Sequence, residues 1–259
     1  MASPELYGRV AIITGTTRGI GLATAKAFLR EGARVVGCAP AADDVPPSLP
    51  EGYVHHACDV SDPKQVEDLV AVTVGGFGRI DCLVNNAGVH PLQRPIDDFD
   101  VAEFNAVLAT NLIGPFVACK AALPLLRKSQ GTIVNVGSTV GLYGQDGSVT
   151  YVASKAALSG LTKALAIDEA RHGVRVNCVC PGAILTPAAT ETHPPEKLRE
   201  IAKWAWQARM GTAEEVAETI LFLASARSAF ITGQDIVIGG GTELGYGAKA
   251  EYPAPEPES

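Results

Sequence analysis

The fold is decided by the stretch Arg9-Val-Ala-Ile-Ile-Thr14, followed by Gly15-Thr-Thr-Arg-Gly19-Ile-Gly21 and by the helical pattern from Leu22 to Arg30. The apolar run predicts a short buried strand, and the spacing after the glycines predicts a helix. Between a strand and a helix, a glycine-rich turn favours a phosphate site, because backbone N–H groups and the helix N-terminus face the anion. The spacing is G-x-x-x-G-x-G rather than G-x-G-x-x-G, and this context favours a nucleotide site over a purely structural turn.

The rest of the chain continues this alternation of strand and helix. Strands are predicted near 9–14, 33–38, 53–57, 80–84, 132–137, 174–179 and 234–238, and helices near 19–31, 63–75, 101–128, 150–171 and 212–224. Such alternation is typical of a doubly wound parallel sheet. We therefore expect one α/β domain over residues 1–250, with a seven-stranded parallel sheet flanked by helices on both faces. Residues 251–259 are rich in Pro and Glu and are predicted to be a tail.

Composition limits the classes of function. The chain has 259 residues, 47% of them hydrophobic, which is enough for one large core. Its net charge is -7 and no basic cluster is present, which argues against nucleic acid and acidic membrane surfaces as partners. We expect no signal segment, no transmembrane span and no internal repeat.

The six cysteines are scattered, mostly within apolar runs, which predicts a reducing, cytoplasmic compartment. Cys178-Val-Cys180 lies on a strand pattern whose alternation puts both side chains on one face. No third or fourth ligand lies nearby in the sequence. We therefore interpret this pair as buried thiols and predict no metal site.

Tyr151-Val-Ala-Ser-Lys155 and Ser138 can assemble an acid/base site. Positions i and i+4 share one face of a helix, so Lys155 can place its charge beneath the phenol of Tyr151 and favour the phenolate. A free tyrosine titrates near ~10, too high for an efficient base at neutral pH. Ser138, at the end of a predicted strand, could hydrogen-bond a substrate oxygen while Tyr151 exchanges its proton. The pattern indicates alcohol and carbonyl chemistry, although Tyr-x-x-x-Lys alone is common on helix surfaces.

Polar residues follow other predicted strands, where ligands bind in an open parallel sheet. After the third strand, Asp59-Val60 offers a carboxylate that could accept a hydrogen bond from an adenine amino group. The alternative is a helix N-terminus formed with Ser61 and Asp62. After the fourth strand, Asn85-Asn86-Ala87-Gly88 could run past a ribose, and the alternative is ordinary turn chemistry.

These motifs together resemble the short-chain dehydrogenase/reductase family. The resemblance covers nearly the whole chain in order and is carried by Thr14-Gly15-x-x-x-Gly19-Ile20-Gly21, Asp59-Val60, Asn85-Asn86-Ala87-Gly88, Asn111, Ser138, Tyr151-x-x-x-Lys155 and Pro181-Gly182. It implies a Rossmann-type sheet that holds a nicotinamide dinucleotide. It also implies four catalytic residues: Tyr151 as the acid/base, Lys155 lowering its pKa and binding ribose, Ser138 orienting the substrate oxygen, and Asn111 supporting a proton path to Lys155.

The same resemblance implies the residues that hold the cofactor. They are Gly15, Arg18, Gly19, Ile20, Gly21, Asp59, Val60, Asn86, Ala87, Gly88, Tyr151, Lys155, Pro181, Gly182, Ile184 and Thr186. Ile184 would pack on the side of the nicotinamide ring, and Thr186 would lie near the carboxamide or the diphosphate. The family commonly forms tetramers through two long helices, here 101–128 and 150–171, which implies a homotetramer.

A closer resemblance is to the branch that contains type-14 17β-hydroxysteroid dehydrogenases and L-fucose dehydrogenases. It is carried by His90-Pro-Leu-Gln-Arg-Pro95, Leu126-Arg-Lys-Ser-Gln-Gly131, Gly173-Val-Arg-Val-Asn-Cys178 and Glu243-Leu-Gly-Tyr-Gly247. It implies a substrate pocket lined by His90, Ser138, Gln145, Tyr151, Leu185 and Tyr246. Each of His90, Gln145 and Tyr246 could instead be a solvated or anchoring residue. The pocket would admit either a sterol or a small sugar.

Residues 185–207 are predicted to form a substrate loop, irregular at first and then helical around Trp204 and Trp206. One tryptophan could face the pocket while the other packs, or both could belong to the core or an interface.

The chain departs from the branch at the adenosine end of the cofactor. Its second strand is followed by Ala39-Pro40, where NAD-preferring relatives carry an aspartate. No Arg or Lys occurs from Ala39 to Glu51 to hold a 2'-phosphate, apart from help by Arg18, and Asp43 and Asp44 would repel one. We therefore predict NAD as the cofactor, with NADP left open.

Two functions follow from these patterns. The first is an NAD(P)-dependent dehydrogenase that interconverts a secondary alcohol or sugar hemiacetal and its carbonyl, acting on a small molecule. The second is a non-catalytic dinucleotide-binding sensor or interaction protein on the same fold. The presence of all four residues of the acid/base set favours the first.

Overall fold

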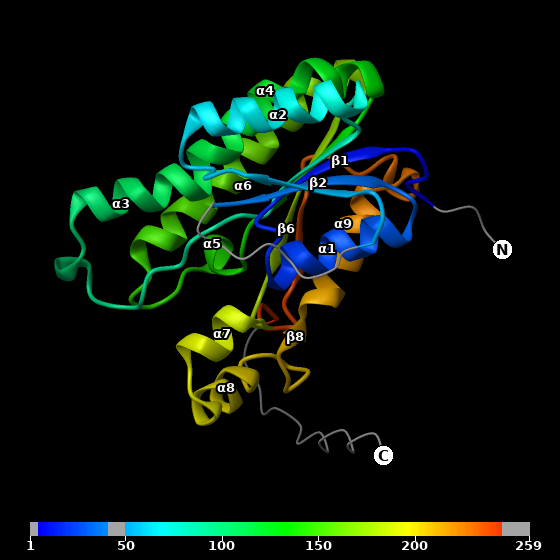
Figure 1. Cartoon of the computed structure of the whole chain (residues 1–259). Coiled ribbons are helices and arrows are strands. Elements are labelled where there is room, and N and C mark those ends of the chain that lie inside the picture. Colours follow the sequence, from blue (N-terminus) through cyan, green and yellow to red (C-terminus); the bar gives the residue numbers. More distant parts are fainter. Residues whose placement is uncertain (1–4, 41–49, 245–259) are drawn as a thin grey trace.

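The computed structural model describes residues 5–40 and 50–244. In it, the seven predicted strands form one parallel sheet in the order β3-β2-β1-β4-β5-β6-β9 (Figure 1). The strands are β1 (Val10–Thr14), β2 (Arg34–Ala39), β3 (Tyr53–Ala57), β4 (Cys82–Asn85), β5 (Thr132–Val136), β6 (Arg175–Pro181) and β9 (Asp235–Ile238). The strand order changes direction between β1 and β4, which opens a crevice at their carboxyl ends. The predicted seven-stranded doubly wound fold is confirmed.

Helices cover both faces of this sheet (Figure 1). On one face lie α1 (Gly19–Arg30) and α9 (Ala213–Ala224), and on the other lie α2 (Pro63–Phe77), α4 (Gly114–Ser129) and α6 (Val149–Glu169). Neighbouring residues of β1 point to opposite faces, as the strand period requires. Ile13 therefore packs in the core with Phe28 of α1, and Ile12 packs in the core with Leu69 of α2.

The predicted helix over 101–128 contains a break in its regular hydrogen bonding. It comprises α3 (Val101–Leu108), a π-helical turn over Ala109–Ile113 and α4. The run Val101–Ser129 is long and apolar enough to cross a membrane by length and composition alone. In this fold, however, α4 contributes Ala118, Ala122 and Leu126 to the core beneath the sheet.

Several short elements were not predicted. They are α5 (Val140–Tyr143), the two-stranded sheet of β7 (Ile184–Leu185) and β8 (Gly211–Thr212), and 3-10 turns at Ile96–Asp98 and Ala226–Ser228. The helical part predicted within 185–207 consists of α7 (Pro187–Thr192) and α8 (Pro195–Ala202), and the helix predicted over 150–171 ends in a 3-10 turn at Ala170–His172.

The prediction for residues 185–207 was wrong in two respects. The segment becomes helical at Pro187, because a proline at the first helical position fits the helix and Thr186 caps it. The tryptophans were expected on a helix but follow α8 in turns. Trp204 is exposed, and the Cβ of Trp206 lies 3.1 Å from the position of a Cβ built on Gly241. The predicted tail over 251–259 lies outside the described residues.

One row of the sheet is polar and faces α6. The row runs across four adjacent strands through the paired positions Asn85, Asn135, Cys178 and Asp235. Asn85 donates to Asn135 at 2.8 Å, and Asn135 donates to Thr162 of α6 at 2.9 Å. Buried polar groups are stable only when they are hydrogen-bonded, so this row and α6 must remain in register.

Close packing at Gly114 provides a test of this arrangement. A Cβ on Gly114 would lie 2.5 Å from the backbone oxygen of Val60, so Gly114→Ala should force α4 away from the sheet and lower the free energy of unfolding by about 1–3 kcal/mol. The matched control is Gly75→Ala in α2, where no atom lies within 4 Å. It should raise stability by up to about 1 kcal/mol. Urea unfolding measures both, and a Gly114→Ala protein as stable as wild type would contradict the packing described.

Candidate active site

The glycine turn between β1 and α1 is held by the segment after β4. The side-chain amide of Asn86 donates to the backbone oxygens of Thr14 and Gly15 at 2.8 and 3.0 Å, and the Thr14 hydroxyl accepts from the N–H groups of Asn86 and Ala87. A Cβ on Gly21 would lie 2.0 Å from the oxygen of Gly15, so no side chain fits there. At the start of α1, Arg18 gives no side-chain cap. The first N–H groups of the helix are therefore left to face an anion, as the phosphate-site prediction requires.

Asp59 is partly engaged by its own turn. Its Oδ1 accepts from the N–H and the hydroxyl of Ser61 at 2.9 and 2.7 Å. The cap of α2 is instead Asp62, which accepts from the N–H of Lys64. Among the described residues, Oδ2 of Asp59 has no hydrogen bond in the structure, so the predicted adenine contact is compatible with this turn. Val60 is buried beneath α4, which leaves its backbone as the part that could meet a ligand.

The three catalytic candidates converge at the carboxyl end of β5. Ser138 follows that strand, and its side chain faces the phenol of Tyr151, in the first turn of α6, closely enough to lower the pKa of that phenol. One turn later, the ammonium of Lys155 donates to the backbone oxygen of Val136 at 2.8 Å and lies 5.7 Å from the centre of the Tyr151 ring. The geometry brings together a proton-transfer group, a hydroxyl that can hold a substrate oxygen, and a buried cation.

The electrostatics differ from the expectation that Lys155 lowers the pKa of Tyr151. Burial raises the pKa of Tyr151 to about 12, although the side chain of Ser138 opposes this rise. Burial also lowers the pKa of Lys155 to about 8. Desolvation disfavours the charged form of each group in the protein alone. An oxidised nicotinamide is the hydride acceptor in such chemistry and brings a positive charge that favours the phenolate.

Asn111 is buried in the π-helical turn and is satisfied by three hydrogen bonds. Its amide donates to the oxygen of Val89 at 2.9 Å and to the Ser154 hydroxyl at 3.0 Å, and its Oδ1 accepts from the N–H of Val89. A Cβ on Gly88 would lie 3.3 Å from both Oδ1 of Asn111 and Nζ of Lys155. Asn111 thus fixes the backbone beside Lys155. The proton path through Asn111 stays a prediction.

His90 lies against the catalytic tyrosine. The centres of the His90 and Tyr151 rings are 4.1 Å apart, tilted by 56°, and Nε2 of His90 lies 3.5 Å from the Ser148 hydroxyl. Burial lowers the pKa of His90, helped by the charges of His193 and Lys155, so a neutral ring is favoured at the site. The residue predicted from the branch resemblance is therefore in place to meet a substrate.

The other substrate candidates are less closely placed. Gln145 is half-buried in the turn before α6, and its backbone oxygen accepts from the N–H of Ser148. Leu185 is half exposed in β7. Tyr246 lies outside the described residues. Sequence reasoning missed two serines. The Ser148 hydroxyl lies beside His90, and the Ser154 hydroxyl accepts from Asn111. Ser154 lies inside the Tyr-x-x-x-Lys motif and was treated only as a spacer.

The segment after β6 bends back toward the glycine turn. Thr186 lies beside Gly19, where a Cβ on the glycine would be 3.6 Å from the Thr186 side chain. This places Thr186 at the diphosphate end of the predicted cofactor site, next to Pro181-Gly182. Ile184 was expected beside the nicotinamide ring, yet its side chain is about nine-tenths buried in the core. Ile20 is partly buried and packs against the core.

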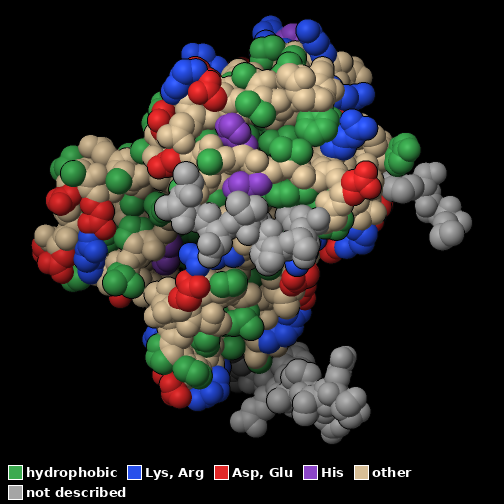
Figure 2. Space-filling model, in the orientation of Figure 1, with side chains coloured by type: hydrophobic (Ala, Val, Ile, Leu, Met, Phe, Trp, Pro, Cys, Tyr) green, Lys and Arg blue, Asp and Glu red, His purple; other side chains and the backbone are tan. Residues whose placement is uncertain are grey.

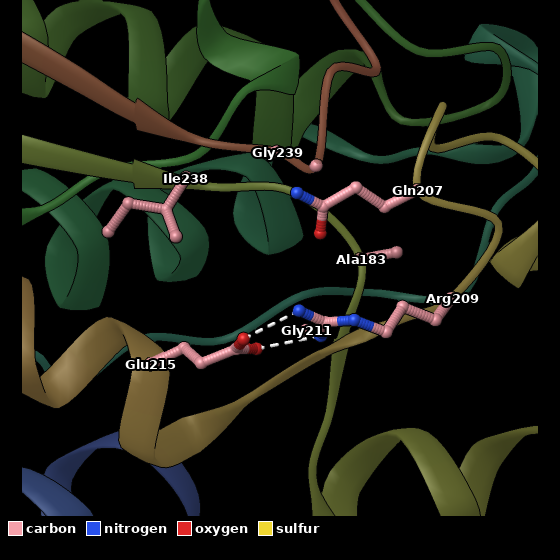
Figure 3. Close-up of a pocket in the computed structure, with 8 residues that line it drawn as sticks. Ala183, Gln207, Arg209, Gly211, Glu215, Ile238 and Gly239 are labelled. Carbon is pink, nitrogen blue, oxygen red and sulfur yellow. Dashed lines mark hydrogen bonds and ion pairs between the residues drawn. The ribbon is translucent and has the colours of Figure 1, made fainter. Parts of the chain in front are cut away.

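A small cavity of about 180 Å³ lies on the other side of this segment, between Ala183, Gly239 and Gln207 (Figure 3). Its charged groups, Arg209 and Glu215, form a two-point ion pair at 2.6 and 2.9 Å, which lowers the pKa of Glu215 to about 2. The cavity is smaller than typical ligand sites of about 300–1,000 Å³, and its charges neutralise each other. We therefore assign it to packing at the start of α9 rather than to substrate binding.

Comparisons with known proteins agree with this geometry. A family profile described as enoyl-(acyl carrier protein) reductase matches residues 15–243. L-fucose dehydrogenase of Bos taurus is 44% identical over 256 residues, which cover 96% of this chain and 94% of the relative. The 3-oxoacyl-(acyl-carrier-protein) reductase of Thermotoga maritima is 39% identical over 245 residues, covering 92% and 98%. The ligand-free structure of Thermoplasma acidophilum aldohexose dehydrogenase superposes with a TM-score of 0.86 at 33% identity, covering 98% of this chain and all of that one.

Removal of the Tyr151 hydroxyl tests the catalytic assignment. Tyr151→Phe should lower turnover by at least about 10²-fold, because it removes the hydroxyl assigned to exchange the substrate proton. Cofactor binding, measured by quenching of protein fluorescence, should stay within about threefold of wild type. The matched control is Tyr143→Phe, since Tyr143 is exposed on α5. If Tyr151→Phe kept wild-type turnover, the assignment would be wrong.

Proposed function

The chain belongs to the short-chain dehydrogenase/reductase family, and we propose that it oxidises the hemiacetal carbon of a small aldose such as L-fucose. It is an NAD(P)-dependent oxidoreductase that acts on CH–OH donors. In the proposed reaction the hydroxyl proton passes to the Tyr151 phenolate, a hydride leaves the same carbon for the nicotinamide, and a lactone carbonyl forms. The observation that carries this proposal is the convergence of Tyr151, Ser138 and His90 at one substrate position.

The polar rim of the site supports a sugar. Next to Tyr151, Nε2 of His90 lies 3.5 Å from the hydroxyl of Ser148, which is buried behind it, and the half-buried Gln145 begins the same turn. Several donors and acceptors close together suit a molecule with adjacent hydroxyl groups. The relatives named L-fucose dehydrogenase and aldohexose dehydrogenase point to the same class of substrate.

A hydroxysteroid is the second candidate. Leu185 in β7 and Tyr143 in α5 are exposed large side chains in the segments that follow the two strands carrying the site. Apolar side chains in these positions could pack on the rings of a sterol. This alternative retains the same proton and hydride transfer at a secondary alcohol.

NAD is the proposed cofactor of preference. The only cation that sequence reasoning found for a 2'-phosphate was Arg18, and its guanidinium is bound to Glu191 of α7 at 2.6 Å. A 2'-phosphate would have to compete with this carboxylate. The β2 strand ends at Ala39, which is buried and offers no side-chain charge. Asp43 and Asp44 lie outside the described residues.

A substrate and cofactor screen tests both proposals. Reduced-cofactor absorbance should rise with L-fucose and NAD, and kcat/KM with NADP should be at least about tenfold lower, since Arg18 is already paired. Related aldoses at equal concentration serve as the specificity series, and 17β-hydroxysteroids form the second arm. Turnover of steroids with none of sugars would replace the first candidate by the second. A preference for NADP would overturn the cofactor proposal.

We also propose that the protein is a homotetramer built through α4 and α6. A groove between these helices is lined by Phe116, Leu123, Pro124 and Leu165, with Lys120 and Arg127 at its edges. Phe116 is half exposed and Ile167 largely exposed. Hydrophobic side chains lie among charged ones over the layer that contains α2 and α4 (Figure 2).

A cytosolic location stays our proposal. It is supported by the six buried thiols, of which none forms a disulfide. Cell fractionation would check it.

A change of charge in the groove tests the interface. Phe116→Glu should shift the mass measured by light scattering from four chains toward smaller species, because a carboxylate would be desolvated against an apolar surface. The matched control is Val72→Glu on α2, which is also half exposed but lies outside the groove. A wild-type protein that runs as a monomer would refute the tetramer.

A further inference from the structure

We propose that Cys178, Cys180 and Asp235 form a site for one thiophilic divalent cation such as Zn²⁺, beneath the strand end that carries the catalytic serine. Nothing in the proposed dehydrogenase reaction uses these three side chains. Their ligand atoms, two sulfurs and one carboxylate oxygen, all lie within 4.8 Å of one another. Thiolate and carboxylate are both ligands that zinc takes in proteins.

The sheet itself places the three ligands. Cys178 and Cys180 are two residues apart on β6, so their side chains share one face. Asp235 on β9 is paired directly with Cys178 in the parallel register and therefore lies on the same face. The two sulfurs are 3.8 Å apart. A tetrahedral ion with Zn–S bonds of about 2.3 Å needs its sulfurs about 3.8 Å apart, so the pair already spans one edge of that tetrahedron.

Asp235 has an oxygen available for an ion. Its Oδ2 accepts from the Ser159 hydroxyl at 2.7 Å and from the ammonium of Lys163. Its Oδ1 is buried and has no hydrogen-bond partner among the described residues. A buried carboxylate oxygen without a partner is costly, and an ion held with the two sulfurs would satisfy it. Sequence reasoning rejected a metal because it could not see that β9 brings this third ligand.

A metal ion suits the pair better than a disulfide. The sulfurs would have to close from 3.8 Å to about 2.05 Å, which pinches a strand that is hydrogen-bonded to β5 and β9 on its two sides. An ion of the size of Zn²⁺ needs no such movement. Both thiols are buried, but Lys163 is half exposed over Asp235 at the edge strand of the sheet. An entering cation would bind Oδ1 while the ammonium of Lys163 stays on Oδ2, and the two positive charges would repel each other.

The proposed site adjoins the catalytic centre. A Cβ on Gly137 would lie 2.7 Å from the Cys178 sulfur and 3.2 Å from the Cys180 sulfur, so both sulfurs press on the residue before Ser138. The backbone of Ser138 is close enough to the sulfur of Cys180 to help lower the pKa of that thiol. An ion bound to these sulfurs would therefore lie next to the backbone that positions the Ser138 hydroxyl.

Cobalt binding to the full chain tests the proposal. The protein is stripped with a chelator, kept reduced, and titrated with Co²⁺ alone. We expect one Co²⁺ per chain with sulfur-to-cobalt charge-transfer absorption, displacement by Zn²⁺ with loss of colour, and a higher Tm with either ion, because the ion binds the folded state. Co²⁺ that binds without this absorption, or fails to bind, would overturn the proposal.

Four variants assign the ligands. Cys178→Ser and Cys180→Ser should each abolish the charge-transfer absorption or weaken Co²⁺ binding by at least about tenfold, and Asp235→Asn should weaken it about tenfold. Lys163→Gln should tighten binding by up to about fivefold, because it removes a positive charge next to the site while leaving all three ligands. This variant tests the site by a gain, which a folding defect would not produce.

Cys82→Ser is the matched control. Cys82 is a fully buried thiol on β4 of the same sheet, remote from the cluster, so its variant should bind Co²⁺ as wild type does. Absorption that survives in both β6 variants, or is lost in Cys82→Ser, would place the ion at another thiol and overturn the assignment.

Discussion

The burial of the Lys155 ammonium is the constraint on which the centre of this molecule depends. An ammonium removed from water is stable only where protein dipoles replace the lost solvent. Here the oxygen of Val136 accepts from it at 2.8 Å, and Oδ1 of Asn111 stands nearby across Gly88. The end of β5, the π-helical turn and the segment after β4 must therefore all meet α6 at this point. Tyr151, one turn earlier, is positioned by the same contacts.

Glycines make this meeting of backbones possible. A Cβ on Gly141 would lie 2.9 Å from the Cβ of Lys155, so α5 can cross α6 only without a side chain there. Gly137 sits over the sulfurs of β6 in the same way, and Gly88 lies between two polar atoms. The π-helical turn adds one residue to a helical turn and directs Asn111 inward. Close backbone approach, rather than side-chain bulk, defines the catalytic centre.

The sequence predicts the sheet and its main helices well, because period-two and period-3.6 patterns are local properties. It cannot reveal contacts that depend on strand register. Asp235 lies beside Cys178 only because β9 pairs with β6. The sequence alone therefore did not show that Asp235 joins Cys178 and Cys180. The π-helical turn was hidden because its apolar spacing resembles that of an ordinary helix. In the protein alone, burial raises the pKa of Tyr151, and the sequence spacing does not report burial. The lowering of that pKa by Lys155 stays a prediction.

The catalytic centre and the thiol cluster are successive parts of one polar stripe on α6. Tyr151, Lys155, Ser159 and Lys163 recur every four residues, so the backbone positions of the two lysines are about 12 Å apart along the helix axis. The polar row of the sheet faces this stripe. Asn135 donates to Thr162 of α6, and Asp235 accepts from Ser159 of the same helix. A shift of α6 that altered the hold of Asp235 on Ser159 would therefore move Lys155 as well. The rigidity of the helix thus couples the edge of the sheet to the acid/base site.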